Sequence, residues 1–193
     1  MPILILYASE HGTTAEIAER LSSRIASQLP PTEVHALSDI DPTTLPNYTA
    51  IILGSAIHGA AWLPKATNFL TANKNALLQK PLFVFSVGAP DAMPKLLRGW
   101  WKRMEERKIK EKVEKVLGTK VKGEALFGGK LDEGEVGGCV SCCCGMFGGR
   151  TVGDFRKWEE VEAWADEVVG VLKKPAEGEG EGVEGESQRG LAD

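Results

Sequence analysis

The fold is decided by the stretch Ile3-Leu4-Ile5-Leu6-Tyr7-Ala8-Ser9-Glu10-His11-Gly12-Thr13-Thr14-Ala15-Glu16-Ile17-Ala18. An apolar run ends in a short loop with hydroxyl side chains and one glycine, and a helical pattern begins at once. The first amides of that helix have no partner within the helix, so together with the loop hydroxyls they suit an anion such as a phosphate. The alternative interpretation is that Ser9 or Thr13 only caps the helix.

The bulk composition indicates one globular domain. The chain has 193 residues, 42% of them hydrophobic, and a formal net charge of −4 at pH 7. This length is enough for a buried core, and the acidic balance argues against a nucleic-acid-binding protein. No apolar run is long enough to cross a bilayer, and no signal-like segment precedes the first strand, so we expect a cytoplasmic protein. The four cysteines lie close together, which is not typical of a disulfide framework.

Strand and helix patterns alternate along the chain. Strands are predicted at residues 3–8, 33–37, 50–55, 81–87 and 124–127, and helices at residues 14–28, 64–77, 94–117 and 158–173. Residues 39–47, with two prolines, are predicted to form a loop. Five strands separated by helices predict an α/β fold with an open, doubly wound parallel sheet and helices on both faces.

Three loops of this sheet are expected to form a ligand site. In doubly wound sheets, ligands bind beyond the carboxyl ends of the strands, at the point where the strand order reverses. The loops at residues 9–14, 54–63 and 86–90 are rich in small and hydroxyl residues, which allow the backbone to approach a ligand closely. The chain has neither the glycine-rich dinucleotide fingerprint after its first strand nor a P-loop pattern, which argues against these two classes of nucleotide-binding protein.

The same loops resemble those of flavodoxins. The opening loop is similar to their phosphate loop, Ser/Thr-x-Thr-Gly-x-Thr, with His11 in place of the middle threonine. The resemblance continues at residues 53–63, 81–88, 127–132 and 153–158. As a set, these segments are similar to flavodoxin-domain proteins related to the menaquinone-dependent protoporphyrinogen IX dehydrogenase, and the resemblance covers most of residues 1–172.

The resemblance implies a flavodoxin-like five-stranded sheet of order 2-1-3-4-5 with FMN as cofactor. By position, the residues around the phosphate would be Ser9, Glu10, His11, Gly12, Thr13 and Thr14. One side of the flavin ring would be bordered by Ser55, Ala56, Ile57, His58, Gly59 and Trp62, and the other by Ser86, Val87, Gly88 and Ala89. No side chain stands out as a catalytic acid, base or nucleophile, and no metal site is predicted.

Four of these side chains have a more specific interpretation. His11 could donate a hydrogen bond to the phosphate, whereas Glu10 is expected to contribute only its backbone because a phosphate repels its carboxylate. Trp62 could stack on the flavin or lie in the core. His58 could tune the protonation of the flavin or be a solvated loop residue.

A basic segment at residues 95–122 contains 11 of the 23 lysines and arginines of the chain and only four glutamates. One interpretation is a solvated helix face. The other is that Trp100, Trp101 and the surrounding basic residues dock an acidic redox partner or an anionic membrane surface.

The cysteine cluster has several interpretations. It comprises Cys139, Cys142, Cys143 and Cys144. These thiols could bind zinc or a metal cluster, form a redox disulfide or be acylated, or they could be incidental to a glycine-rich loop. The segment also differs from the resembled dehydrogenase, in which a longer aromatic and basic insertion would follow the fifth strand.

We therefore expect residues 1–174 to form one FMN-binding flavodoxin-like domain and residues 175–193 to form a disordered tail of glutamate and glycine. The expected function is electron transfer with a redox partner protein, without a transmembrane span and compatible with peripheral membrane contact. Two alternatives stay open. One is an FMN-dependent dehydrogenase that acts on protoporphyrinogen IX, another tetrapyrrole or a quinone, and the other is a flavin-free interaction scaffold.

Overall fold

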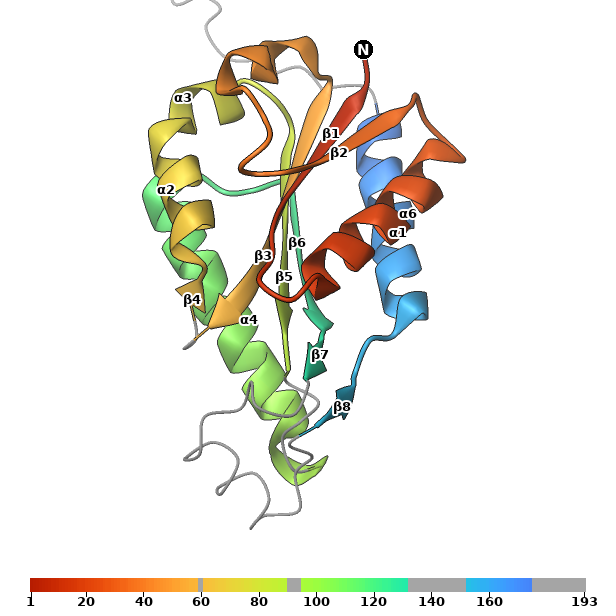
Figure 1. Ribbon diagram of the computed structural model, residues 1–193, viewed down its shortest axis with the longest axis vertical. Coiled ribbons are helices and arrows are strands. Elements are labelled where there is room, and N and C mark those ends of the chain that lie inside the picture. Colours follow the sequence, from red (N-terminus) through yellow and green to blue (C-terminus); the bar gives the residue numbers. More distant parts are fainter. Residues whose placement is uncertain (59–60, 90–94, 132–151, 175–193) are drawn as a thin grey trace, which may run out of the picture.

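The computed structural model describes residues 1–58, 61–89, 95–131 and 152–174 and shows a parallel sheet between two layers of helices (Figure 1). The long strands are β1 (Ile3–Ala8), β2 (Thr32–Ala36), β3 (Ala50–His58), β5 (Leu82–Gly88) and β6 (Gly123–Gly128). Their order in the sheet is β2-β1-β3-β5-β6. This confirms the predicted order 2-1-3-4-5, because β5 and β6 are the fourth and fifth of the long strands along the chain.

The helices cover both faces of this sheet. They are α1 (Thr13–Ala26), α2 (Pro64–Ala72), α3 (Lys74–Leu77), α4 (Lys95–Leu117) and α6 (Trp158–Lys173). In β1, Ile3 and Ile5 belong to the core cluster of α1 and α6, whereas Leu4 and Leu6 belong to the cluster of α2, α3 and α4. Because both faces are covered, the central strands are continuous apolar runs and do not alternate with polar residues.

Three predicted elements differ from the observed ones. The helix predicted at residues 64–77 is two helices, because Asn73 has φ −109° and ψ 15°, outside the helical region. Part of the predicted loop forms a short 3-10 helix, η1 (Pro42–Asn47), in which Asp41 accepts a hydrogen bond from the amide of Thr43 at 2.9 Å. The third strand extends to His58 instead of residue 55, since its end pairs with the short antiparallel strand β4 (Ala61–Trp62).

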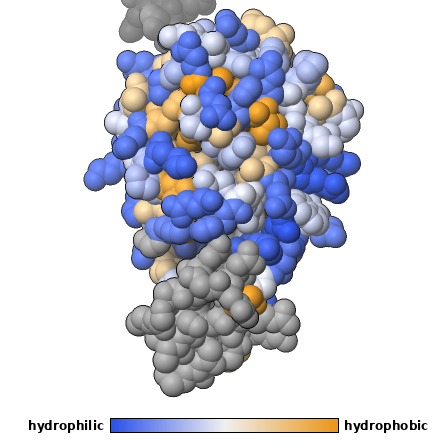
Figure 2. Space-filling model, viewed as in Figure 1, coloured by the Kyte–Doolittle hydropathy of each residue, from blue (hydrophilic) through white to orange (hydrophobic). Residues whose placement is uncertain are grey.

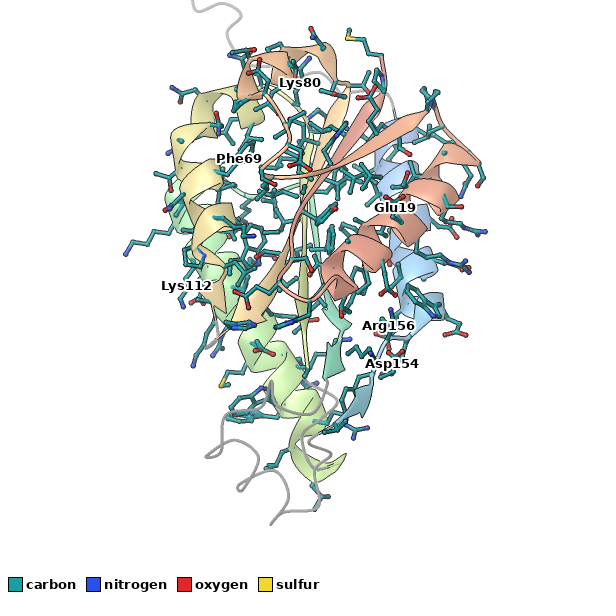
Figure 3. All side chains as sticks on the ribbon, viewed as in Figure 1. Glu19, Phe69, Lys80, Lys112, Asp154 and Arg156 are labelled. Atoms are coloured by element: carbon teal, nitrogen blue, oxygen red, sulfur yellow. The ribbon has the colours of Figure 1, made fainter. Side chains whose placement is uncertain are left out.

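A small second sheet connects β6 to the last helix. It consists of the antiparallel strands β7 (Lys130–Leu131) and β8 (Gly153–Asp154). Arg156 donates hydrogen bonds to Asp154 at 2.9 and 2.6 Å and forms a further ion pair with Glu16 of α1. Figure 3 shows Asp154 and Arg156 together where the chain leads into α6. Because only 12% of the Arg156 side chain is exposed, this network holds the start of α6 against α1 more firmly than a fully exposed pair would.

The surface is mostly polar on the face drawn in Figure 2. Hydrophilic residues prevail in its coloured part, and hydrophobic residues occur in small separate areas. Among the described residues, no helix combines the length and the apolar character that a membrane span needs. The cysteine cluster and the tail at residues 175–193 lie outside the described residues, so their interpretations stay predictions.

Gly54 provides a test of the packing at the centre of the sheet. A Cβ atom at this position would lie 2.0 Å from Cζ of Phe85, whose ring packs against Phe127 and Trp164 and cannot move away easily. We expect Gly54→Ala to lower the free energy of unfolding by about 2 kcal/mol or more. Urea unfolding measures this change.

Gly170 in α6 is the matched control, because a Cβ atom there would meet nothing within 4 Å. We expect Gly170→Ala to raise the free energy of unfolding by about 0.5–1 kcal/mol, since alanine favours a helix interior over glycine. Equal stability of Gly54→Ala and the wild-type protein would contradict the tight contact with Phe85.

Candidate ligand-binding site

Three loops meet at the carboxyl edge of the sheet. They follow β1, β3 and β5, which are adjacent and parallel, so that Ala8 is in register with Ser55 and Ser55 with Ser86. This edge is the lower one in Figure 1, where α1 begins. The loops border a hollow whose lining residues are Ser9, Glu10, His11, Thr13, Thr14, Ala56, Ile57, His58, Val87, Gly88, Ala89, Gly129 and Lys130.

The hollow brings together most of the residues predicted to bind a cofactor. Eleven of the thirteen lining residues were among them. Four other predicted residues, Gly12, Ser55, Trp62 and Ser86, do not line it, and Gly59 lies outside the described residues. The prediction missed Gly129 and Lys130, which follow β6 at the same edge of the sheet. Their position directly after the predicted fifth strand could have indicated that they lie at this edge.

The start of α1 has no side-chain cap. Gly12 occupies the N-cap position with φ 86°, a left-handed conformation that favours glycine. Its own amide donates to Oγ of Ser9 at 3.0 Å, but the next three amides of the helix have no hydrogen-bond partner among the described residues. The alternative that Ser9 or Thr13 caps the helix is therefore not observed. These amides and the helix dipole make the loop favourable for an anion.

Thr14 is a second, independent sign of a ligand. This residue is 1% exposed, and its Oγ1 atom is buried without a hydrogen-bond partner in the described part of the chain. Leaving a buried hydroxyl unpaired costs about 1–3 kcal/mol. Because Thr14 lines the hollow, a ligand oxygen bound there is the natural partner for this hydroxyl.

Charged side chains surround the rim of the hollow. The carboxylate of Glu10 lies 3.1 Å from Nε2 of His58 and 4.0 Å from Nε2 of His11. Nζ of Lys65 donates to the backbone oxygen of Ser9 at 3.5 Å, and Lys130 also lines the hollow. The carboxylate of Glu10 is therefore engaged by the imidazole of His58 at the rim.

The opposite part of the hollow has an apolar wall of small residues. A Cβ atom at Gly88 would lie 3.2 Å from Cδ1 of Ile57, and one at Gly129 would lie 3.0 Å from Cγ1 of Val87. The amide of Gly129 donates to the backbone oxygen of Gly88 at 2.6 Å, which joins the ends of β5 and β6. A larger side chain would therefore be crowded at either glycine, and the wall there is backbone packed closely against Ile57 and Val87.

Three of the predicted residues that do not line the hollow support its wall instead. The indole Nε1 of Trp62 donates to Oγ of Ser86 at 2.8 Å, and this tryptophan is 7% exposed within the core. Oγ of Ser55, which is fully buried, donates to the backbone oxygen of Ala56 and accepts from the amide of Leu63. Of the two interpretations of Trp62, the observed position corresponds to the core residue. These bonds fix the ends of β3 and β5 where they border the hollow.

No candidate metal centre accompanies the hollow. Within the ranges that the structure describes, histidine, cysteine, aspartate and glutamate form no group of three or more that could hold a metal ion.

Comparison with known proteins identifies the family of the fold. The family model for the flavodoxin domain matches residues 4–137. A search of curated protein sequences gives no match.

Several solved structures are similar in fold. One is a short-chain flavodoxin associated with a non-canonical PDU bacterial microcompartment, with a TM-score of 0.57, 12% identity and coverage of 90% of this chain and 100% of that chain. A flavodoxin from the domain Archaea has a TM-score of 0.51 at 15% identity, with the same coverage. The rubredoxin oxygen:oxidoreductase of Desulfovibrio gigas has a TM-score of 0.54 at 13% identity, with 89% of this chain covered. This chain spans only 36% of the length of that last protein.

Glu105 of α4 lies behind the apolar wall. The residue is 9% exposed, and its Oε2 atom would lie 3.7 Å from a Cβ atom at Gly88. Burial raises the pKa of this carboxyl, and the neighbouring charge of Glu106 raises it further. Because the pKa is higher in the folded than in the unfolded state, the carboxyl contributes most to stability when it is protonated. This contribution is complete below the unfolded pKa and is lost as the pH rises through the folded pKa.

We therefore expect Glu105→Gln to have a higher free energy of unfolding than the wild-type protein at neutral pH, and the difference to disappear below about pH 4. Urea unfolding over a range of pH measures this dependence. Glu111→Gln is the matched control on the same helix, because the side chain of Glu111 is 69% exposed and its removal should change stability by less than about 0.5 kcal/mol. A difference for Glu105→Gln that is constant from acidic to neutral pH would contradict the role of the buried charge.

Proposed function

Because the chain belongs to the flavodoxin domain family, we propose that it binds FMN in the hollow at the carboxyl edge of the sheet and transfers electrons. The observation that carries the proposal is the uncapped start of α1 beside the unpaired hydroxyl of Thr14. The buried hydroxyl without a partner is costly, and the free helix amides beside it favour an anion with several acceptor oxygens, such as a phosphate.

The residues of the opening loop fit the phosphate of FMN. The amides of Thr13, Thr14 and Ala15 and the hydroxyl of Thr14 would supply donors. Lys130 would add positive charge, and the imidazole of His11 also lines the hollow. Glu10 is proposed to contribute no direct contact, because its carboxylate faces the imidazole of His58 at 3.1 Å.

The small apolar residues of the other two loops fit the flavin ring. Bound FMN would supply the capacity to accept and release one or two electrons. Ile57 and Val87 would pack against the ring, beside the backbone of Gly88, which also lines the hollow. Nε2 of His58 lies 3.1 Å from the carboxylate of Glu10 at the rim of the hollow. Trp62 is proposed to position Ser86 and not to stack on the ring.

An FMN-dependent dehydrogenase of protoporphyrinogen IX or of a quinone is the second candidate function. The resemblance in the loops suggests it, and one structural observation favours it. Leu96, Leu97 and Trp100 are exposed at the start of α4, only a few residues after Ala89 of the hollow. A large apolar substrate could approach over this surface. Oxidation of protoporphyrinogen by the holoprotein with a quinone acceptor would support the dehydrogenase, whereas electron exchange with a carrier protein alone would support a carrier.

The first test is the visible spectrum of the purified protein, followed by release and identification of any flavin. We expect one FMN per chain, either as purified or after addition of FMN. A colourless protein that takes up no FMN would contradict the proposal and would favour a flavin-free interaction scaffold.

Thr14→Val tests the phosphate site directly. This change removes the hydroxyl and keeps the shape of the side chain. We expect it to weaken FMN binding by about tenfold to a hundredfold, because a charged acceptor loses one donor. The stability of the flavin-free protein should not fall, since the hydroxyl has no partner to lose among the described residues. Fluorescence titration with FMN measures the affinity.

The matched control is Thr71→Val in α2. The hydroxyl of Thr71 donates to the backbone oxygen of Thr67 at 2.8 Å and lies outside the hollow. FMN affinity should be unchanged in this variant. Equal affinities of Thr14→Val and the wild-type protein would exclude the hydroxyl of Thr14 as a ligand of the phosphate.

A further inference from the structure

The first two turns of α4 expose a cluster of large apolar side chains. Leu96, Leu97 and Trp100, which we call the α4 tip, are 98%, 47% and 58% exposed. Figure 1 shows that these turns project past the lower ends of β3 and β5, on the same side of the molecule as the hollow. Single exposed apolar side chains are ordinary, but a group of them at a projecting end marks an interaction surface.

Basic side chains follow the α4 tip along the same stripe of the helix. Leu96, Trp100, Arg103 and Arg107 are spaced by four, three and four residues, which places them on one face. Arg103 is exposed, as is Lys108 beside this stripe, and the side chain of Arg107 is 71% exposed. At a rise of about 1.5 Å per residue, Arg103 and Arg107 lie roughly 5 and 10 Å behind Trp100 along the helix axis.

Among the described residues, the charges beside this stripe leave the surface cationic. Lys102 is paired with Glu160 at 3.1 Å and so contributes little to it. Glu111 lies 3.9 Å from Arg107, in an exposed and weak pair at the far end of the stripe. Glu105 is buried against the sheet and Glu106 is half-buried, so neither of these two carboxylates is fully exposed beside the α4 tip.

We propose that the α4 tip docks on an anionic membrane surface. Leu96, Leu97 and Trp100 would enter the boundary between headgroups and acyl chains, and Arg103 and Arg107 would lie at the level of the lipid phosphates. The order of the side chains favours a bilayer over an acidic protein. Apolar groups come first at a projecting end and cations follow at a depth of about 5–10 Å, which matches the layers of a membrane interface.

Docking in this way would place the hollow close to the membrane surface, because Ala89 of its wall is only six residues before Lys95 of α4. The inference does not depend on FMN, since none of the residues of the α4 tip lines the hollow. Flavin-free and flavin-loaded protein should therefore bind membranes alike, and failure of the proposed function would leave this inference standing.

The test is sedimentation of the full chain with vesicles of phosphatidylcholine that contain about one third phosphatidylglycerol. We expect binding that weakens with added salt and is at least about tenfold weaker to vesicles of phosphatidylcholine alone. Leu96→Ser with Trp100→Ser should reduce binding about tenfold or more. Arg103→Glu with Arg107→Glu should reduce it to a similar extent. Unchanged thermal unfolding of each variant shows that the fold is kept.

Matched controls use residues of the same kinds away from the α4 tip. Leu78→Ser with Val171→Ser removes two other exposed apolar side chains, and Lys120→Glu with Lys173→Glu reverses two other exposed charges. Both should bind vesicles as the wild-type protein does.

The proposal is overturned if the wild-type protein does not sediment with anionic vesicles, or if the control variants lose as much binding as the α4 tip variants. If the full chain binds polyglutamate through the α4 tip but does not bind vesicles, the membrane proposal is overturned in favour of an acidic protein partner.

Discussion

Parallel hydrogen bonding between β1, β3 and β5 is the constraint on which the rest of the molecule depends. The central strand β3 pairs with β1 from Ile3–Ala50 to Ala8–Ser55 and with β5 from Ile51–Leu82 to Ala56–Val87. Parallel neighbours cannot be joined by tight turns, so each connection must cross a face of the sheet, and helices provide it. Both faces are then covered, which requires apolar residues on both sides of these strands. All carboxyl ends also lie at one edge, where their loops must meet.

At that edge the regular hydrogen bonding of strands and helices ends, and some polar groups are left without partners. The first amides of α1 and the hydroxyl of Thr14 are such groups. By contrast, Ser55 and Ser86, one layer deeper, are satisfied by the amide of Leu63 and the indole of Trp62. The inner layer therefore fixes the wall of the hollow, while the outer layer has donors that a ligand bound as proposed would engage. Polar groups without hydrogen-bond partners are common at functional sites.

The α4 tip, close to the same edge, carries exposed apolar side chains with basic residues behind them. The chain is acidic overall, with a net charge of −4, yet the exposed side chains behind the start of α4 are mainly basic. The hollow, with its pair of Glu10 and His58, and the exposed α4 tip thus lie on one side of the molecule. Because electron transfer and membrane docking both need short distances, this arrangement would let one face of the protein serve both.

The sequence alone determined the five long strands and most of the helices and, through the resemblance of its loops, the strand order. Branched apolar runs such as Ile3–Leu6 and the periodic pattern of α6 depend on near neighbours in the chain, so they could be predicted. The break at Asn73 and the extension of β3 to His58 could not, because both are short local features without an apolar periodicity. The side-chain amide of Asn73 donates to the backbone oxygen of Phe69 at 3.0 Å, and the end of β3 pairs with β4 only three to five residues further along the chain.

Only the tertiary structure decided which residues line the hollow and which support it. A tryptophan after an apolar strand is equally compatible with a stacking residue and a core residue, and only the hydrogen bond to Ser86 places Trp62 in the core. Gly129 and Lys130 join the hollow because β6 pairs with β5, far from the opening loop in sequence. Residues that are near in sequence decide where most helices and strands form. Strand register and burial decide which residues line the hollow, because they bring together residues that are distant in the chain.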